Sequence, residues 1–584
     1  MSKVTLIVDG QTFKARKDAL CEFSDYFRAM FSGNYVENEL REVQINVVDA
    51  CSMKAIIKYI ENGLIDLTDY SLNELNDLAA SANFLQITEL LKQIECVLDL
   101  RLNVANCLHI MGMADMASFP ALEKLAASYA LFQFKEMKAE YIPSLQSLHW
   151  YLSHSHLNTD CELSVFKMGL QWVIEAHRSA DALLIVLGCL DIAALTVQEL
   201  QEMQQLLKEY QYSLASKMVD CLHEIFVRFW DISSTDIVKN KQLLCELYTE
   251  RVYTEVLNLV NSSMKRELKL VPCVSLTEST GCHEKGPQFI YTFNESTGFE
   301  KWLEIPEKNL WGWSVAAWGA HRLVVAGGEY GRGSGRFLRD VLVYDTLRAR
   351  WLRLGARLPP RRHAGLAVRG DTLYMAGGVG SFRIVLSCAI AVDLEERSFR
   401  KLAALPDALQ SPALCVHADT LYAGGHKHVY RLAERADGGE RWEQAVESRA
   451  LRPSCLVPLA AHVYMAQSYC SHLLRFRPGE DKYVDTYKSF VNPVVAMCTD
   501  GKSVVAVCAA AAGGELRAVE RYEGGELRRT RVLWTQPDQA SELTVSAVCG
   551  AVALALGAPP LRPARSAWAA QQLRAFLATP HPDY

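Results

Sequence analysis

The sequence lacks the short motifs that carry most enzymatic and metal-binding chemistry. It has no C-x-x-C pair, HExxH, GxxxxGK[ST] or GxSxG, so a structural zinc site, a zinc protease, a P-loop and a nucleophile elbow are unsupported. The 17 cysteines are an odd number without paired spacing, which argues against a disulfide framework. The first apolar run, 4–8, is too short for a secretory signal. We therefore expect no metal and no cofactor, and a cytoplasmic location, with the nucleus and cytoskeleton as alternatives.

A long uncharged stretch is also rare, and only residues 543–561 approach the length of a membrane-spanning helix. Gly550 divides this stretch into two short runs, and Pro559 and Pro560 end it. This punctuation favours two strands joined by a turn over a membrane helix.

The charge is divided unevenly along the chain. The net charge of −6 hides an acidic first part, with 24 basic and 36 acidic residues up to residue 270, and a basic second part, with 37 and 31. The basic residues also change from mostly lysine to mostly arginine. Because 584 residues are too many for one ordinary core, this shift predicts a domain boundary near residue 270.

Before residue 270 the apolar residues follow two patterns. Residues 4–8 and 11–13 flank an Asp-Gly turn and predict a hairpin, 17–31 predict a helix and 43–48 predict a strand. From 50 to about 265 the apolar spacing predicts helices almost throughout, separated by short loops. We therefore expect a small α/β module followed by antiparallel neighbouring helices.

After residue 270 a repeat replaces the helical pattern. Apolar runs end in glycine pairs at Gly328, Gly378 and Gly425, and VYMA at 463–466 and VVAV at 504–507 occupy the next two places. Each repeat has room for four short strands. Glycine allows close approach of backbones, and spaced Tyr and Trp side chains provide area for packing between repeats. This predicts an all-β propeller of five to six blades, with six favoured; a β-sandwich is the alternative.

Together these segments resemble the BTB–BACK–Kelch family along nearly the whole chain. Residues 13–31 (FKARKDALCEFSDYFRAMF) are similar to the BTB, or POZ, signature, and 102–115 (LNVANCLHIMGMAD) to the start of the following helical box. Residues 152–173 are similar to the BACK helices and 339–378 to Kelch repeats. Each motif alone is weak, but their order across three domains is specific.

The resemblance implies a multidomain protein: an α/β BTB domain, an all-α BACK domain and an all-β Kelch propeller. The implied boundaries are 1–100 for BTB without the usual N-terminal extension, 101–265 for three-box and BACK helices, 266–288 for a transition segment, 289–560 for the propeller and 561–584 for a tail. In this family the BTB domain and adjoining helices hold cullin-3, and the propeller holds a protein to be ubiquitinated. The implied function is a non-catalytic substrate adaptor of a cullin-3 RING ubiquitin ligase. A cytoskeletal scaffold, for example on actin, is the alternative.

The family contacts cullin-3 through a hydrophobic-x-Glu motif that follows a Met-Phe pair. An apolar side chain would anchor in a cullin pocket, while the carboxylate would meet polar groups at its rim. A solvated loop with an incidental glutamate is the alternative. The resemblance assigns cullin contact to Met30, Phe31, Tyr35, Val36, Glu37 and Tyr59.

Several positions depart from the family pattern. Only three residues precede Val4, Lys3 stands where the family has Asp, and Arg16 where it has His. We therefore expect the family's homodimer to be disfavoured. Residues 61–63 (ENG) replace the family's YTG, which alters another part of the cullin-facing surface.

Loops at one end of the propeller channel are expected to bind the substrate, because connections between blades and after each second strand gather there. Guanidinium groups suit capture of carboxylates, and aromatic side chains add contact area. We therefore expect an unidentified protein with an acidic segment; solubilising arginines are the alternative. The expected residues are Arg332, Arg336, Arg339, Arg361, Arg362, His363, Arg383, His426, His428, Arg449, Arg452, Tyr469 and His472.

Two other functions have less support. The glycine-rich stretch 331–336 (GRGSGR) lacks GxGxxG spacing and lies between expected strands, which favours a flexible blade loop over a nucleotide site. Zinc fingers, which accompany BTB domains in transcription factors, are not readable here, and the arginines are interleaved with acids. We therefore expect neither nucleic acid nor a membrane as a partner.

Overall fold

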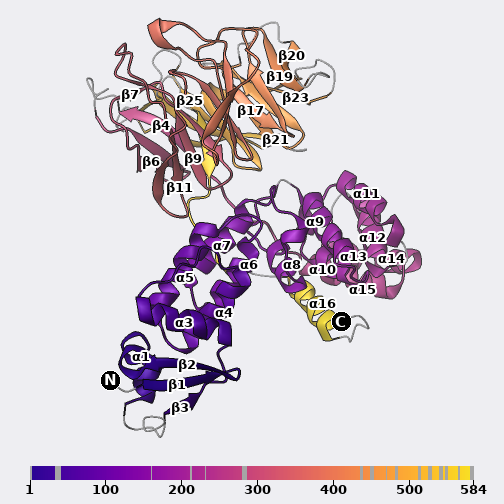
Figure 1. The fold of residues 1–584 in the computed structure, drawn as a ribbon. Helices are drawn as coiled ribbons and strands as arrows, with labels where there is room; N and C mark the ends of the chain where they lie inside the picture. Colours follow the sequence, from indigo (N-terminus) through magenta and orange to yellow (C-terminus); the bar gives the residue numbers. More distant parts are fainter. Residues whose placement is uncertain are drawn as a thin grey trace. The chain divides into compact units, whose positions relative to one another are not determined.

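The structure, a computed structural model, consists of two units that we describe separately. It describes residues 3–32, 41–159, 161–210, 213–229, 232–278, 286–434, 439–447, 453–467, 470–479, 485–510, 515–523, 529–537, 543–545, 550–562 and 566–578. The helical unit comprises residues 1–267 and 558–584, and the propeller unit comprises residues 268–557 (Figure 1).

The helical unit begins with the small α/β module that the sequence predicts. Strand β1 (Lys3–Val8) pairs antiparallel with β2 (Gln11–Arg16) and parallel with β3 (Glu42–Gln44). Alternation along β1 places Val4, Leu6 and Val8 in the core. The helices of this module are α1 (Lys17–Phe23), α2 (Asp25–Met30), α3 (Ala50–Asn62), α4 (Leu72–Phe84) and α5 (Thr88–Arg101).

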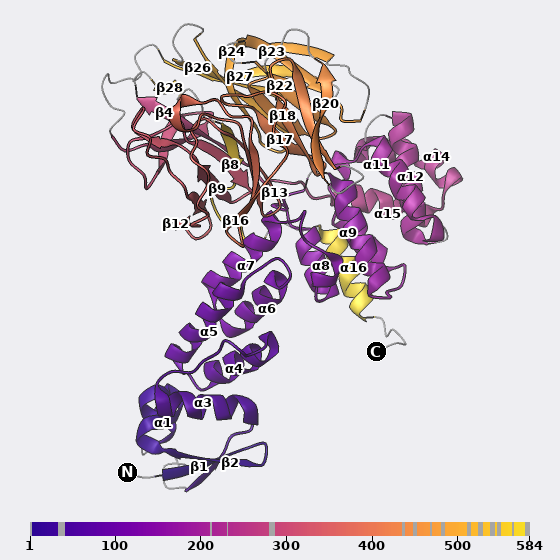
Figure 2. The ribbon, with the colours of Figure 1, turned by 45° about the horizontal axis from the view of Figure 1, so that its top comes forward.

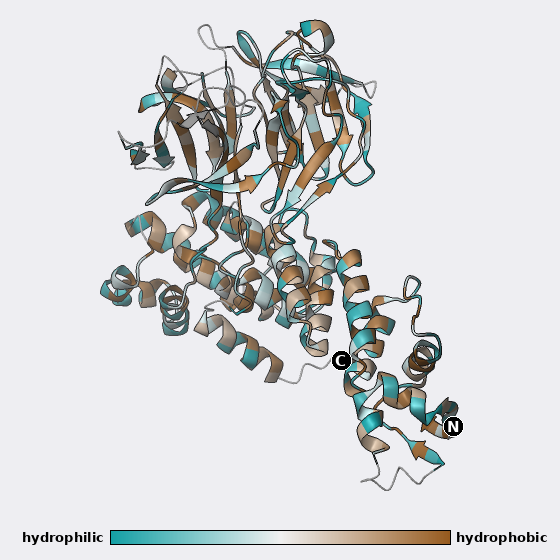
Figure 3. Cartoon of the chain, turned by 90° about the vertical axis from the view of Figure 1, so that its left-hand side faces the viewer, coloured by the Kyte–Doolittle hydropathy of each residue, from teal (hydrophilic) through white to brown (hydrophobic). Residues whose placement is uncertain are grey.

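The predicted helical array follows and is confirmed. Its helices bury apolar residues at helical spacing, as α12 does with Met218, Leu222 and Ile225. Figure 3 shows the resulting change of hydropathy from one side of a helix to the other. The helices are α6 (Cys107–Ala117), α7 (Pro120–Phe132), α8 (Leu145–Leu152), α9 (Glu162–Glu175), α10 (Ala182–Gly188), α11 (Val197–Leu206), α12 (Leu214–Phe229), α13 (Ser234–Lys239), α14 (Lys241–Leu247) and α15 (Glu250–Asn261).

The C-terminal segment, which the sequence analysis treats as a tail, contains helix α16 (Ala567–Ala578) and belongs to the helical unit. This helix packs on α10 (Figure 1) and lies beside α8 (Figure 2). A Cβ atom on Gly188 would come within 2.5 Å of the Ala569 side chain, so the glycine permits this close packing. Trp568 Nε1 donates a 2.7 Å hydrogen bond to Glu255. The chain therefore returns to the helical unit after the propeller.

One buried ion pair anchors the last residues of the helical unit before the propeller. Arg266 and Glu162 lie 2.8 Å apart, with side chains only 7% and 3% exposed. The Arg266 guanidinium also donates to the carbonyls of Leu152, His154 and Cys189. The surrounding carbonyls compensate for the desolvation of this charge.

Four-stranded antiparallel sheets build the propeller unit. One sheet contains β8 (Ser314–Trp318), β9 (Arg322–Ala326), β11 (Val341–Asp345) and β12 (Arg350–Arg353). The next contain β13 (Gly365–Arg369), β14 (Thr372–Ala376), β15 (Ala389–Asp393) and β16 (Ser398–Lys401), and then β17 (Leu414–His417), β18 (Thr420–Gly424), β19 (His428–Glu434) and β20 (Glu440–Glu447).

The following sheet has seven strands because β24 is shared. It runs from β21 (Cys455–Leu459) through β22 (His462–Ala466) and β23 (Cys470–Phe476) to β24 (Asp485–Thr499), and on through β25 (Ser503–Ala509), β26 (Leu516–Glu523) and β27 (Arg529–Thr535). The first part of β24 pairs with β23 and its last part with β25. This sheet therefore combines two four-stranded groups.

Strands from both ends of the propeller sequence share the last sheet. Strands β28 (Leu543–Val545) and β29 (Ala551–Leu554) both pair with β4 (Val271–Glu278), which pairs with β5 (Phe289–Asn294), followed by β6 (Gly298–Glu304). The uncharged stretch 543–561 thus supplies strands, as predicted, and no helix among the described residues is long and apolar enough to span a membrane. Strand β4 lies within the expected transition segment, so the propeller begins earlier than predicted.

The innermost strands form a closed ring. In the part of the chain that the structure describes, β8, β13, β17, β21, β24 and β29 each contact the next, and β29 contacts β8. This ring supports six blades over five. The predicted role of the spaced aromatics is visible between sheets, where Trp351 Nε1 donates to Glu304 O and Trp442 Nε1 donates to Ala403 O.

We expect Arg266→Ala to destabilise the helical unit by about 3–5 kcal/mol, because it leaves Glu162 buried without its cation. Lys167→Ala, which breaks the exposed Lys167–Glu202 pair, should cost no more than about 1 kcal/mol. The loss of stability in each variant is measured by hydrogen exchange of α9 and α10 in the full chain. Equal protection in the two variants would contradict the anchoring role of Arg266.

Candidate interaction surfaces

The predicted cullin-contact residues on α2 lie at the surface of the α/β module. Ser24 caps α2 by accepting a 3.1 Å hydrogen bond from Phe27 N, and its hydroxyl donates to Leu85 O at 2.6 Å. Phe31 stacks on buried Phe27 with ring centroids 6.0 Å apart. Met30 and Phe31 are themselves half-buried. The helix end that precedes the expected contact motif is therefore held firmly to the core.

The other predicted cullin-contact residues either lie outside the described residues or are buried. Tyr35, Val36 and Glu37 lie outside the described residues. Tyr59 is only 2% exposed, and its ring packs edge-on against Phe23 at 5.5 Å. Burial raises the pKa of its hydroxyl. The assignment of Tyr59 as a contact residue was wrong, because α3 turns this ring into the core.

The propeller has two distinct ends. Because neighbouring strands are antiparallel, the connections 327–340, 354–364 and 377–388 lie at one end, which we call the loop end. Turns such as 319–321 lie at the opposite end, and Ala555 N donates to Ala320 O there at 2.7 Å. Residue 554 pairs with residue 271, so the chain both enters and leaves the propeller at this opposite end. We call the two places where the chain passes between the units the chain crossings. Both chain crossings therefore lie at the end opposite the loop end.

A three-residue segment, 361–363, joins the connections at the loop end. Its backbone accepts hydrogen bonds from Gly328 and Ser411, donates to Gly312 and exchanges two bonds with Val379. These partners come from four separate connections. Segment 361–363 is thus a structural hub of the loop end, and its three side chains are also buried.

This burial corrects the prediction that these three residues contact a substrate. Arg361 is 1% exposed, and its guanidinium donates to Gly377 O and Cys388 O, both at 3.2 Å. Arg362 is 7% exposed and pairs with buried Glu329 at 2.7 Å. Adjacent arginines in a sequence suggest a binding surface. Here the two guanidinium groups instead bind carbonyl oxygens and a carboxylate of the loops themselves.

Trp311, which the sequence analysis did not select, organises the same region. The guanidinium groups of Arg332 and Arg362 lie 4.7 and 4.8 Å from its ring centroid. The ring of His363 packs edge-on against it at 4.4 Å. Burial, with the nearby charges of Arg362 and Arg332, lowers the pKa of His363 to about 4. His363 is therefore neutral at physiological pH.

The remaining predicted substrate-contact residues are exposed, half-buried or outside the described residues. Arg332, Arg336, Arg339, Arg383, His426 and His472 are exposed, and His428 is half-buried. Arg339 Nε donates to Leu358 O at 2.9 Å. Arg449, Arg452 and Tyr469 lie outside the described residues. The structure brings Arg332, Arg336 and Arg383 onto adjacent connections, since Arg383 Nη2 is 3.6 Å from the position of a Cβ on Gly333.

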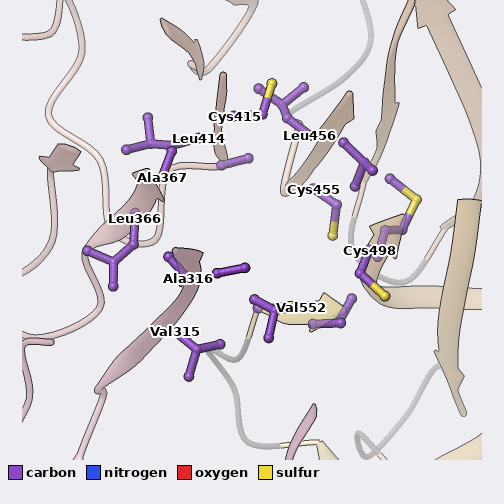
Figure 4. A pocket seen from close by; sticks show the side chains of 18 of the residues that line it. Val315, Ala316, Leu366, Ala367, Leu414, Cys415, Cys455, Leu456, Cys498 and Val552 are labelled. Carbon is purple, nitrogen blue, oxygen red and sulfur yellow. The ribbon is translucent and has the colours of Figure 1, made fainter. Parts of the chain in front are cut away.

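The central channel is a separate cavity of about 440 Å³. Side chains from the six innermost strands surround it, including those of Ala316, Cys455 and Val552 (Figure 4). Its lining contains no charged residue. Burial raises the pKa of Cys455 to about 11 and also raises those of Cys415 and Cys498. These thiols are protonated at neutral pH and therefore weak nucleophiles.

Comparison with known proteins gives matches along the chain. A family model described as BTB/POZ domain matches residues 1–101, and one described as BTB And C-terminal Kelch matches residues 107–205. Kelch-like protein 26 of Mus musculus is 25% identical over 64% of this chain and 59% of its own length. Kelch-like protein 38 of Homo sapiens is 20% identical over 83% of this chain and 81% of its own length. Kelch-like protein 40b of Danio rerio is 30% identical over 30% of this chain and 28% of its own length.

We expect the propeller to lose stability as the pH falls from about 6.5 toward 4. The folded-state pKa of His363 is about 4, below the value of about 6.5 in an unfolded chain, so only the unfolded state takes up this proton in that range. Burial lowers the pKa of His321 as well. Thermal unfolding at pH 7 and pH 5 measures the loss, which for His363 is at most about 2 kcal/mol over this interval.

The control for this prediction is His363→Asn, because Asn does not titrate and tolerates the positive φ of 55° at this position. The variant should lose less stability between pH 7 and pH 5 than the original chain. An identical pH dependence in both proteins would contradict the role of His363.

Proposed function

This chain belongs to the BTB–BACK–Kelch family, and from that premise we propose that it is a substrate adaptor of a cullin-3 RING ubiquitin ligase. One observation carries the proposal: the chain combines a BTB module with a propeller whose loop end is free of both chain crossings. In this proposal the BTB module holds the ligase while the loop end of the propeller holds a target. Partner and substrate are proposals, because the match to mouse Kelch-like protein 26 spans 59% of that protein.

The proposed cullin surface is centred on the end of α2 and the segment that follows. Met30 and Phe31 are half-buried and leave part of their apolar surface accessible, and the cap at Ser24 fixes the helix from which they project. Tyr35, Val36 and Glu37 follow in the sequence after three intervening residues. An apolar anchor next to a carboxylate suits a pocket with a polar rim.

The proposed adaptor contributes position rather than bond-making groups. Holding a target lysine near a ligase-bound ubiquitin converts an encounter in solution into a local reaction, which is a large entropic advantage. The protonated thiols of the channel do not supply the thiolate that covalent ubiquitin transfer by this chain would need. The sequence has no C-x-x-C pair that would indicate a RING, so in this proposal the E2-recruiting part comes from a partner.

We expect the double variant Tyr35→Ala, Glu37→Lys to abolish co-purification of the full chain with cullin-3, because it removes the apolar anchor and reverses the charge beside it. A loss of at least about 30-fold in affinity is typical of an interface hot spot. The matched control is Tyr210→Ala, Glu209→Lys, which makes the same exchanges in the helical unit and should leave binding within about threefold.

Retained binding in the Tyr35, Glu37 variant would contradict the assigned contact. A wild-type chain that does not bind cullin-3 at all would contradict the adaptor function. In that case a bound protein would be unaffected by loss of cullin-3, as expected for a non-catalytic scaffold.

A further inference from the structure

An exposed apolar turn projects from the loop end between β14 and β15. Phe382 is 96% exposed and is the most exposed large apolar side chain among the described residues. Ile384 and Val385, in the same turn, are 59% and 41% exposed. Such a group at a surface rich in arginine is unusual for a monomeric soluble domain, because exposed apolar clusters mark interaction sites.

Hydrogen bonds hold this turn in one conformation. Gly380 N donates to Ile384 O, and Leu386 N donates to Gly378 O, each at 2.9 Å. Val379 forms bridges with both Val385 and Arg362, which ties the turn to the buried hub. Phe382 and Arg383 have φ values of 57° and 60°, a region that such residues rarely adopt. Because the turn is already ordered, presenting Phe382 to a partner costs little conformational entropy.

The exposed charged residues of the connections 327–340, 354–364 and 377–388 are all arginines. Arg332, Arg336 and Arg383 are exposed, and the connections 354–364 and 377–388 contain no acidic residue. We call Phe382, Ile384 and Val385 with these three arginines the Phe382 patch.

The carboxylates of the neighbouring connections are already engaged. Glu329 binds Arg362 and accepts from Gly335 N, Glu307 binds Arg353 and Tyr330, and Asp340 binds Arg353. Each of these carboxylates therefore has a cationic partner other than Arg336 and Arg383. The patch therefore complements a negatively charged partner surface.

We propose that the Phe382 patch inserts into an apolar pocket rimmed by carboxylates on a folded protein. A linear acidic peptide would need a groove to lie in, whereas here the apolar group protrudes and the channel lining carries no charge. The inference rests on the proposed function in identifying this folded partner as the ubiquitination target. It differs from the sequence-based expectation, in which arginines capture an acidic segment and aromatic side chains add contact area.

A lipid surface is the competing occupant, since an aromatic side chain flanked by arginines can also enter a membrane interface. One aromatic and two aliphatic side chains provide only marginal membrane attachment. A protein pocket that encloses a rigid Phe side chain gains more, because it buries the entire ring. The observations therefore favour a protein.

The test uses the full chain with a photo-crosslinking phenylalanine analogue at position 382 and, as a control, at position 399. Phe399 lies on β16 and is 38% exposed. The protein crosslinked from 382 but not from 399 is identified, purified and titrated against the full chain by calorimetry. Phe382→Ala should weaken binding at least about 30-fold, and Phe399→Ala by no more than about threefold.

A second set of variants separates contact from folding and tests the charge. Phe382→Asn tolerates a positive φ and should weaken binding as Phe382→Ala does. Arg336→Glu with Arg383→Glu should also weaken it, and the wild-type affinity should fall as salt is raised. Unchanged affinity in the Phe382 variants, or no crosslink from position 382, would overturn the proposal. Flotation with vesicles of phosphatidylcholine and about 30% phosphatidylserine, lost in Phe382→Ala, would assign the patch to a membrane instead.

Cullin-3 binding in the same preparations separates this inference from the proposed function. Phe382 variants that keep both cullin-3 and the partner contradict this inference alone. A chain that loses its partner on Phe382→Ala but never binds cullin-3 contradicts the adaptor function alone.

Discussion

The pairing of β29 with β4 is the contact on which the rest of the structure depends. It joins residues 551–554 to residues 271–274 and so closes the ring of innermost strands. The same pairing brings both chain crossings to one end, where Ala555 bonds to Ala320. Beyond the crossing, the chain continues into α16, which packs on α10 within the helical unit. One strand pairing thus closes the propeller and sets both chain crossings at the end opposite the loop end.

The loop end depends on a second constraint, the burial of segment 361–363. Three basic side chains enter the interior there because each meets a carbonyl, a carboxylate or an aromatic face. This arrangement fixes the connections on either side of it, including the turn that carries Phe382. The exposed residues can be positioned because these contacts hold the buried residues in place.

Much of this architecture follows from the sequence, because its signals are periodic. Helical spacing predicts the array of the helical unit, and the glycine pairs mark real steric limits: a Cβ on Gly378 would lie 2.7 Å from Arg362 O. Strand β4 and helix α16 were missed because neither carries a repeat motif, and their place is set by pairing with distant segments. Local sequence likewise does not distinguish a buried arginine from an exposed one, so Arg361 and Arg362 were misassigned. The sequence does place Phe382 and Ile384 on either side of Arg383 in a predicted loop. That pattern does not show that Phe382 is exposed, because its exposure depends on the backbone conformation of the turn.

In the proposed function, one unit of the chain holds the ligase and the other holds the target, and a hydrogen-exchange footprint of the full chain with and without cullin-3 can separate the two roles. We expect slower exchange within residues 1–101 and the adjoining helices, with the loop end of the propeller unchanged. Slower exchange at the connections 327–340 and 377–388, with none in residues 1–101, would contradict it.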